Sequence, residues 1–195
     1  MGRVFLLRHG ETEWSATGRH TGRTDIPLTD HGRELAAQAG RTYEALRHGD
    51  PPPVRVIVSP RSRAQETAKL AGLQPDKVDE RLVEWDYGDY EGLTTPQIRE
   101  EVPGWTVWTR PCPGGETADQ VGARADRVLA EVRGLLPEGD VVLVGHGHFS
   151  RVLAARWIGL PAEGGVHIAM EAAALTVLGD ERGVPRLDAV NLRIP

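Results

Sequence analysis

Three short apolar runs and two long amphipathic segments dominate the pattern of hydrophobic and polar positions along the chain. The runs cover residues 3–7, 54–58 and 141–144, and they are rich in β-branched side chains. Almost continuous apolar runs of this length are typical of strands that are buried on both faces of a parallel sheet. We therefore expect these three segments to form the centre of such a sheet.

The first amphipathic segment predicts a helix that begins after Thr29. Thr29 is a suitable N-cap, and the helix presents Leu35, Ala39 and Leu46 on one face. Gly49 and the proline run that follows it end the helical pattern, because proline cannot continue a helix.

The second amphipathic segment begins after Thr117 and ends before Pro137. Its apolar stripe consists of Val121, Ala125, Val128, Val132 and Leu135. Residues 174–178 and 186–190 predict two final strands, arranged as a hairpin at the edge of the sheet. This alternation of strands and helices predicts the α/β class, as a three-layer α/β/α sandwich with a mostly parallel central sheet. We expect one domain over residues 1–195.

Composition and charge narrow the classes of partner. The chain has 195 residues, of which 39% are apolar and 26% charged, and this balance is typical of a globular protein. The net charge is −5 and no Lys/Arg-rich run occurs, so we expect no nucleic-acid partner. No apolar stretch is long enough to cross a bilayer and no signal-peptide pattern is present, which predicts a cytoplasmic protein without a membrane partner. Cys112 is the only cysteine and cannot form an internal disulfide.

Cationic side chains follow all three apolar strands. Arg8 and His9 end the first, "SPRSRAQETA" follows the second and "GHGHFSR" follows the third. In open α/β sheets, ligands bind beyond the carboxyl ends of the strands. If these strands are parallel neighbours, their carboxyl ends lie at one rim of the sheet. That rim would then hold the side chains of Arg8, His9, Arg61 or Arg63, His146 and His148.

Such a cluster suits a phosphoryl group. Guanidinium groups match phosphate oxygens, and Gly10 and Gly147 allow the backbone to approach closely. A neutral imidazole is a competent nucleophile toward phosphorus, and nearby guanidinium charge lowers its pKa and keeps it unprotonated. An isolated Arg-His-Gly sequence would be weak evidence for catalysis, since a histidine after a strand is commonly a structural residue.

At this point the sequence resembles the histidine phosphatase superfamily, which includes phosphoglycerate mutases and many phosphatases. "LLRHGETEW" is similar to the signature that carries the phosphoaccepting histidine, and "SPRSRAQETA", "LVEWDYGDYEG" and "VLVGHGHFSR" are similar to three further family motifs. The resemblance implies that His9 accepts the phosphoryl group, Arg8 and Arg63 clamp it, Glu84 is the proton donor and His146 is the second pocket histidine.

Two departures separate the chain from the mutases. Ser15 stands where mutases usually have asparagine, and their insertion with paired arginines has no evident counterpart. The segment "PGWTVWTRPCPGGET" takes its place, and it looks more like sedoheptulose-bisphosphatase-like and small bacterial acid-phosphatase-like members. Trp85, Trp105 and Trp108 either pack in the core or form a lid over the leaving group.

We therefore predict a metal-independent phosphomonoesterase that hydrolyses small-molecule phosphates, such as sugar phosphates, through a phosphohistidine. The predicted catalytic residues are His9, Glu84, His146, Arg8 and Arg63. The predicted substrate-binding residues are Arg8, Ser15, Thr21, Gly22, Arg63, Glu84, Trp108, Gly147 and His148. Neither a cofactor nor a metal is predicted, although alternating His146 and His148 also permit a metal-ligand interpretation.

Two alternatives stay open at this stage. A mutase would keep the phosphohistidine and return the phosphoryl group to a bound acceptor. A phospholigand-binding module without turnover would lack the nucleophile or the acid, but both His9 and Glu84 are present. The family resemblance also implies a possible homodimer.

Overall fold

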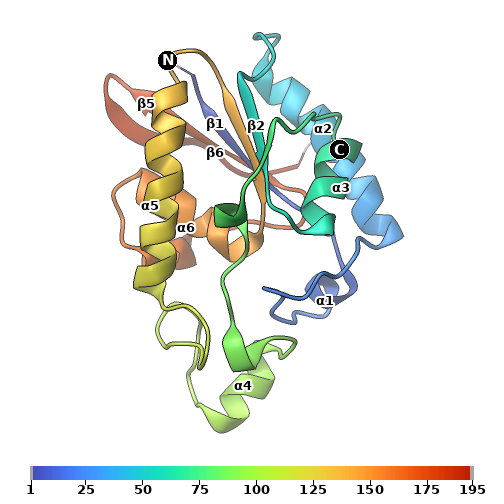
Figure 1. Ribbon diagram of the computed structural model, residues 1–195, viewed down its shortest axis with the longest axis vertical. Coiled ribbons are helices and arrows are strands. Elements are labelled where there is room, and N and C mark those ends of the chain that lie inside the picture. The colour runs from blue at the N-terminus through green and yellow to red at the C-terminus, as the bar shows by residue number, and fades with distance from the viewer. Residues whose placement is uncertain (1, 194–195) are drawn as a thin grey trace.

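The computed structural model describes residues 2–193, which build a six-stranded sheet in the order β3-β2-β4-β1-β5-β6 (Figure 1). The strands are β1 Val4–Arg8, β2 Arg55–Val58, β3 Lys77–Val78, β4 Val141–Gly145, β5 Leu175–Glu181 and β6 Val184–Leu192. The helices are α1 Glu13–Ala16, α2 Asp30–Arg47, α3 Ser62–Leu70, α4 Thr95–Glu101, α5 Ala118–Leu135 and α6 Gly147–Trp157. Short 3-10 turns are η1 Glu80–Leu82, η2 Gly88–Tyr90 and η3 Ala162–His167.

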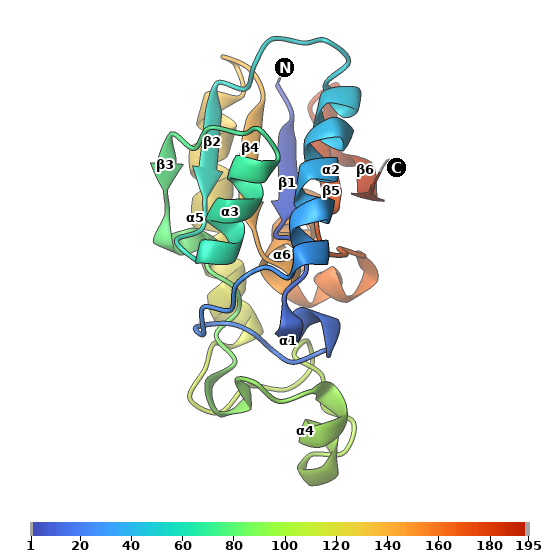
Figure 2. The same ribbon diagram turned by 90° about the vertical axis from the view of Figure 1, so that its right-hand side faces the viewer.

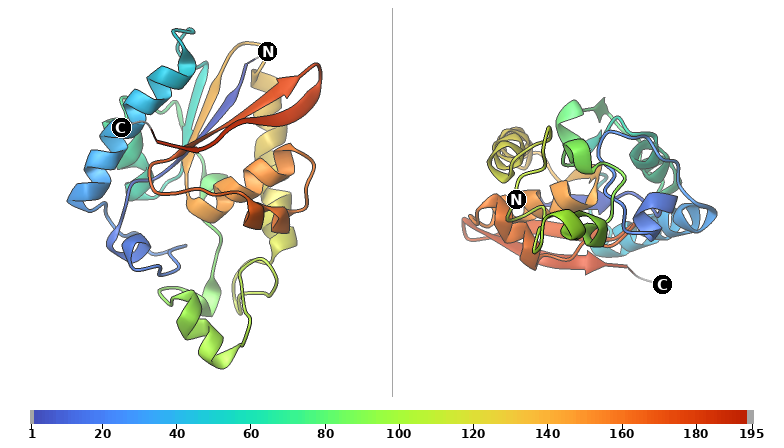
Figure 3. Two further views of the ribbon diagram at one scale, coloured as in Figure 1. Left: turned by 180° about the vertical axis from the view of Figure 1, so that it is seen from behind. Right: turned by 90° about the horizontal axis from the view of Figure 1, so that it is seen from below.

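The pairing of the strands confirms the predicted mostly parallel sheet. β3, β2, β4 and β1 pair in parallel, and β5 and β6 add an antiparallel hairpin at one edge (Figure 3). The three apolar runs are β1, β2 and β4, each shifted by at most one residue at either end from the predicted range. Because β4 lies between β2 and β1, the carboxyl ends of the three strands are neighbours.

Helices cover both faces of the sheet and confirm the three layers. Figure 2 shows α2 and α3 on one side of the strands, with α5 and α6 on the other. Alternate residues of one strand face opposite cores, so Leu6 packs in the core with α5 and α6, and Leu7 packs in the core with α2 and α3. Strands buried on both faces explain the almost continuous apolar runs in the sequence.

The two long helices begin where the sequence predicts. Thr29 caps α2, since its hydroxyl accepts a hydrogen bond from the Gly32 N–H at 2.9 Å. Thr117 caps α5 by accepting from the Gln120 N–H at 3.3 Å, and Gln120 bonds back in a capping box. α2 ends at Arg47, and its C-cap His48 adopts the left-handed conformation (φ 54°) just before Gly49.

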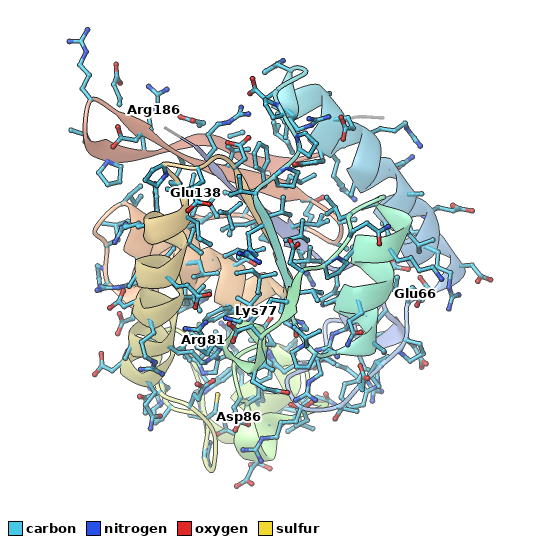
Figure 4. The ribbon with its side chains drawn as sticks, turned by 45° about the horizontal axis from the view of Figure 1, so that its top comes forward. Glu66, Lys77, Arg81, Asp86, Glu138 and Arg186 are labelled. Atoms are coloured by element: carbon cyan, nitrogen blue, oxygen red, sulfur yellow. The ribbon has the colours of Figure 1, made fainter. Side chains whose placement is uncertain are left out.

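A charged cluster ties β3 and η1 to α5. Lys77 Nζ lies 2.9 Å from Glu131 Oε1 and 3.0 Å from Asp79 Oδ2, and Arg81 contacts the same two carboxylates. Lys77 and Arg81 lie beside α5 in Figure 4. This cluster fixes the start of the segment that leads to Glu84.

The carboxyl ends of the strands point toward α1 and α4, which lie beyond the sheet at the bottom of Figure 1. The segments that contain α1 and α4 therefore cover the rim where the cationic side chains were predicted. None of the helices in residues 2–193 has the length and apolar character needed to span a membrane.

Candidate active site

The structure brings the two predicted histidines together at the rim. His9 directly follows β1, and His146 follows β4 as the N-cap of α6. Their imidazole rings are 5.2 Å apart, measured between centroids. The neighbouring ends of β1 and β4 thus produce the convergence that the sequence predicted.

His9 is held in the tautomer that a nucleophile needs. Its side chain is buried, and its Nδ1 lies 2.7 Å from the Gly10 carbonyl oxygen. A carbonyl only accepts, so Nδ1 must carry the proton, which leaves the Nε2 lone pair free. Burial, together with the charges of Arg8 and Arg63, holds the pKa of His9 well below its usual value. The lowered pKa favours the neutral imidazole, which is the nucleophilic form.

His146 is oriented as a hydrogen-bond donor toward the same centre. Its Nε2 lies 2.7 Å from Ser59 Oγ, and that oxygen already accepts the Arg61 N–H at 3.4 Å. The Ser59 hydroxyl can donate to Nε2, and in the tautomer that accepts this bond the imidazole proton lies on Nδ1. Nδ1 is buried and has no partner among the described residues. Burial and Arg63 lower the pKa of His146, so the ring stays neutral.

The arginines use some donors to fix their position and leave others unused. Arg8 Nη1 donates to the Met170 carbonyl at 2.7 Å, and Arg63 donates to the carbonyls of Thr24 at 2.8 Å and Thr21 at 3.1 Å. The Nε atoms of Arg8, Arg61 and Arg63 are buried, and no described residue accepts from them. Buried N–H groups are nearly always hydrogen-bonded in native proteins, so these atoms are available to donate to an anionic ligand.

Glu84 lies at the amino end of α6. Its carboxylate accepts the N–H groups of His148 at 2.9 Å, Phe149 at 2.8 Å and Trp85 at 2.8 Å. The side chain is buried, yet it lines the same pocket as His9. The three donors and the helix N-terminus hold an acid in place beside the nucleophile.

A pocket of about 420 Å³ opens from His9 toward α4. Among its walls are Tyr87, Trp108 and His148, and His148 Nδ1 lies 2.7 Å from the Tyr87 hydroxyl. Of the three tryptophans in the lid interpretation, Trp108 alone lines the pocket, and its side chain also packs in the core. Trp85 and Trp105 are 0% and 1% exposed and do not line the pocket, so they pack in the core.

The predicted small residues have different places. Ser15 and Thr21 line the pocket, and the Ser15 hydroxyl bonds to Thr12 in the capping box of α1. Gly22 does not line it, since its N–H donates to Glu91 and a Cβ there would lie 2.6 Å from the Trp85 carbonyl. Gly147 lines the pocket, and its missing side chain admits the Arg8 guanidinium, which would lie 3.2 Å from a Cβ.

The structure also places at the site several residues whose roles the sequence does not settle. Arg61 is predicted at the rim as the alternative to Arg63, and the Nε atoms of both arginines are buried. Ser59, Tyr87 and Arg151 lie within the quoted motifs, but the sequence assigns them no role because their functions depend on long-range contacts. Within residues 2–193, no three side chains of His, Cys, Asp or Glu gather in a way that could hold a metal ion.

Comparison with known proteins places this geometry in a family. The model of the histidine phosphatase superfamily (branch 1) matches residues 4–193. The chain belongs to this superfamily. The resemblance stated from the four sequence motifs is thereby confirmed.

Individual relatives agree with the predicted phosphatase branch. An acid phosphatase of Mycobacterium tuberculosis is 50% identical over 190 residues, which are 97% of this chain and 92% of that protein. Sedoheptulose 1,7-bisphosphatase of Saccharomyces cerevisiae is 38% identical over 81% of this chain and 68% of that protein. The solved structure of an open reading frame of Mycobacterium tuberculosis is 50% identical, covers 98% of each chain and superposes with a TM-score of 0.94.

Proposed function

We propose that the protein is a metal-independent phosphomonoesterase that hydrolyses small-molecule phosphates through a phosphohistidine at His9. One observation carries this proposal. Four buried nitrogens, on Arg8, Arg61, Arg63 and His146, lack an acceptor beside the free lone pair of His9. A phosphoryl group supplies the oxygens that these donors need and the electrophile that His9 needs.

In the first step, His9 Nε2 attacks phosphorus and the bond to the ester oxygen breaks. The orphaned donors stabilise the charge on the equatorial oxygens, which is the main catalytic task in phosphoryl transfer. Glu84 gives a proton to the departing oxygen. In the second step, Glu84 takes a proton from water, the water oxygen attacks phosphorus, and the bond to Nε2 breaks with release of inorganic phosphate.

The other predicted roles stay with this proposal. Ser15, Thr21, Trp108, Gly147 and His148 form the walls that receive the ester group, whereas Gly22 packs against the Trp85 carbonyl outside the lining. Positive charge from the arginines takes the place that a divalent metal has in other phosphoryl-transfer sites, so no metal and no cofactor is required. A single domain, a cytoplasmic location and a homodimer remain predictions from the sequence and the family.

Trapping the phosphoenzyme tests the nucleophile. Brief exposure to a labelled sugar phosphate, with chelator present and followed by quenching, should give an acid-labile phosphoenzyme. His9→Ala should abolish the label because the attacking nitrogen is removed. His31→Ala, on the exposed surface of α2, is the matched control and should keep it. Equal labelling of His9→Ala, or labelling that requires added divalent metal, would refute the proposal.

The products separate hydrolysis from the two alternatives. With 3-phosphoglycerate and a bisphosphoglycerate primer, we expect inorganic phosphate to accumulate faster than 2-phosphoglycerate. The reverse order would identify a mutase. Phosphate binding without turnover of any member of a broad phosphomonoester panel would identify a binding module.

A further inference from the structure

The outer part of the pocket contains three arginines that the hydrolysis mechanism does not use. Arg19 follows α1, Arg99 lies on α4 and Arg151 lies on α6, and all three line the pocket. Three segments distant in the sequence thus bring cationic side chains to one cavity. Within residues 2–193, no carboxylate lies within ion-pair distance of any of them.

Arg151 is the most firmly held of the three. Its Nε donates to the Gly165 carbonyl at 3.0 Å, its Nη2 donates to the Val166 carbonyl at 3.2 Å, and its Cζ lies 4.5 Å from the centre of the Trp108 ring. Nη1 makes no hydrogen bond with the described residues, so one donor group stays available to a ligand. Burial lowers the pKa of Arg151, and the charge of Glu84 offsets this effect only in part.

Arg99 and Arg19 extend this positive wall. Arg99 Nε donates to the Trp105 carbonyl at 2.8 Å, and its two terminal nitrogens have no partner among residues 2–193. The Arg19 side chain also makes no hydrogen bond within that range. Several arginines outside the pocket do pair with a carboxylate. Arg156 Nε, for example, lies 2.9 Å from Asp126 Oδ1.

The charges of the pocket exceed what one phosphate requires. Its lining contains four arginines and one carboxylate, Glu84, while lowered pKa values keep its histidines neutral. Arg8 and Glu84 serve the phosphoryl group that is transferred, with help from Arg61 and Arg63 outside the lining. Three positive charges therefore remain without a counter-charge.

We propose that Arg19, Arg99 and Arg151 form a second anion subsite, which binds a further phosphate or carboxylate group of the same substrate molecule. Guanidinium groups form strong charge-assisted hydrogen bonds with either oxyacid. The cavity of about 420 Å³ is within the range of small-molecule sites, so a metabolite that carries two acidic groups fits. This inference rests on the proposed function, because the first acidic group is the phosphate that His9 attacks.

Matched substrate pairs test the subsite. Fructose 1,6-bisphosphate and fructose 1-phosphate differ by a second phosphate, and 3-phosphoglycerate and glycerol 3-phosphate differ by a carboxylate. We expect at least one pair to show a preference of roughly tenfold or more in kcat/KM for the member with two acidic groups, as a charge-assisted hydrogen bond predicts. The pair with the larger preference identifies the second group as phosphate or carboxylate.

Variants tie this preference to the arginines. Arg151→Gln and Arg99→Gln should each reduce the preference by roughly tenfold, and Arg99→Lys should restore part of it because the charge is kept. Arg127→Gln, on the exposed surface of α5 and outside the pocket, should leave the preference unchanged. Arg19 and Arg99 are exposed, so Arg19→Gln and Arg99→Gln keep the test valid if Arg151→Gln fails to fold.

The outcomes distinguish the inference from the proposed function. If the wild type hydrolyses p-nitrophenyl phosphate but prefers neither acidic member of the two pairs, the second subsite is refuted and the phosphatase stands. A preference that survives all three arginine variants also refutes the subsite. If the wild type hydrolyses neither p-nitrophenyl phosphate nor any of the four metabolites, the proposed function fails and the inference fails with it.

Discussion

Hydrogen bonds to the backbone and to one serine decide the roles of the two histidines. In the proposed mechanism, His9 donates a hydrogen bond from Nδ1 to the Gly10 carbonyl and attacks through Nε2, whereas His146 accepts a hydrogen bond at Nε2 and donates through Nδ1. The same residue type thus provides a nucleophile and a donor within one small site. Ser59 is a positioning residue in this arrangement, since it acts on the phosphoryl group through His146.

Glu84→Gln tests the proton donor. A glutamine cannot supply an acidic proton, so transfer from an alkyl phosphate to His9 should slow by roughly 10² to 10⁴-fold. Transfer from an aryl phosphate should slow far less, because a phenolate leaves without protonation. Rapid-quench measurement of the first step for both substrates checks this, since later hydrolysis also uses Glu84.

The contacts of Glu84 explain why two substrates must be compared in one variant. Its two oxygens accept three backbone N–H groups, so the amide nitrogen of glutamine would face one of these donors. This repulsion weakens the local structure equally for both substrates, and their ratio reports protonation alone. Equal slowing in the first step would make Glu84 a binding residue and not the acid.

For single residues, the sequence predicts which ones belong to the site better than it predicts their surroundings. The strand ends predicted His9 and His146 at one rim and the family resemblance predicted Glu84 as the acid, and the structure brings the three together. The buried Nε of Arg61 was not predictable, because its surroundings come from a segment 85 residues away that contains His146.

The elements around Glu84 are held by Arg124 on α5. Arg124 Nη1 donates to the carbonyls of Arg81 at 2.9 Å and Val83 at 2.7 Å, and its other nitrogens pair with the Glu116 carboxylate at 3.0 and 2.7 Å. The guanidinium also lies 4.2 Å from the centre of the Phe149 ring on α6. One buried side chain therefore connects α5, α6 and the backbone that carries the proposed acid.

Arg124→Gln should separate these elements. The substitution leaves Glu116 without its cation and two buried carbonyls without a donor, so the free energy of unfolding should fall by about 3–5 kcal/mol. Urea denaturation measures the loss, and Arg127→Gln on the exposed surface of α5 is the control that should change stability little. A loss similar to that of the control would show that Arg124 does not hold the segment.

The sequence predicted those helices and strands that have clear local signals. α2 and α5 carry threonine caps and apolar stripes, and the structure confirms both helices at the predicted starts. β3 has two residues and exists because it pairs with β2, and α4 has seven residues and one buried side chain. Such elements are stabilised by contacts with distant segments, so sequence periodicity alone could not predict them.

Across the whole molecule, the burial that prepares the site for catalysis also couples folding to pH. His9 and His146 have pKa values well below the usual 6.5, with burial as the largest cause, and burial lowers the pKa of His20 to about 4. The unfolded chain protonates these histidines near pH 6.5, whereas the folded chain resists protonation. Between these values the unfolded state binds more protons, so acid favours unfolding.

We therefore expect the free energy of unfolding to fall as the pH decreases from 7.5 to 5. Each histidine whose folded pKa lies below 5 contributes a loss of about 2 kcal/mol at pH 5. Asp79 also has a lowered pKa, held down mainly by its hydrogen bonds with Arg81, but its contribution is lost only at more acidic pH, below its unfolded value of 3.8. Urea denaturation at pH 7.5 and pH 5 separates the two effects, and His20→Gln should reduce the difference by about 2 kcal/mol. An equal free energy at both pH values would show that these histidines are not kept neutral in the folded protein, and the lone pair proposed for His9 would then not persist in acid.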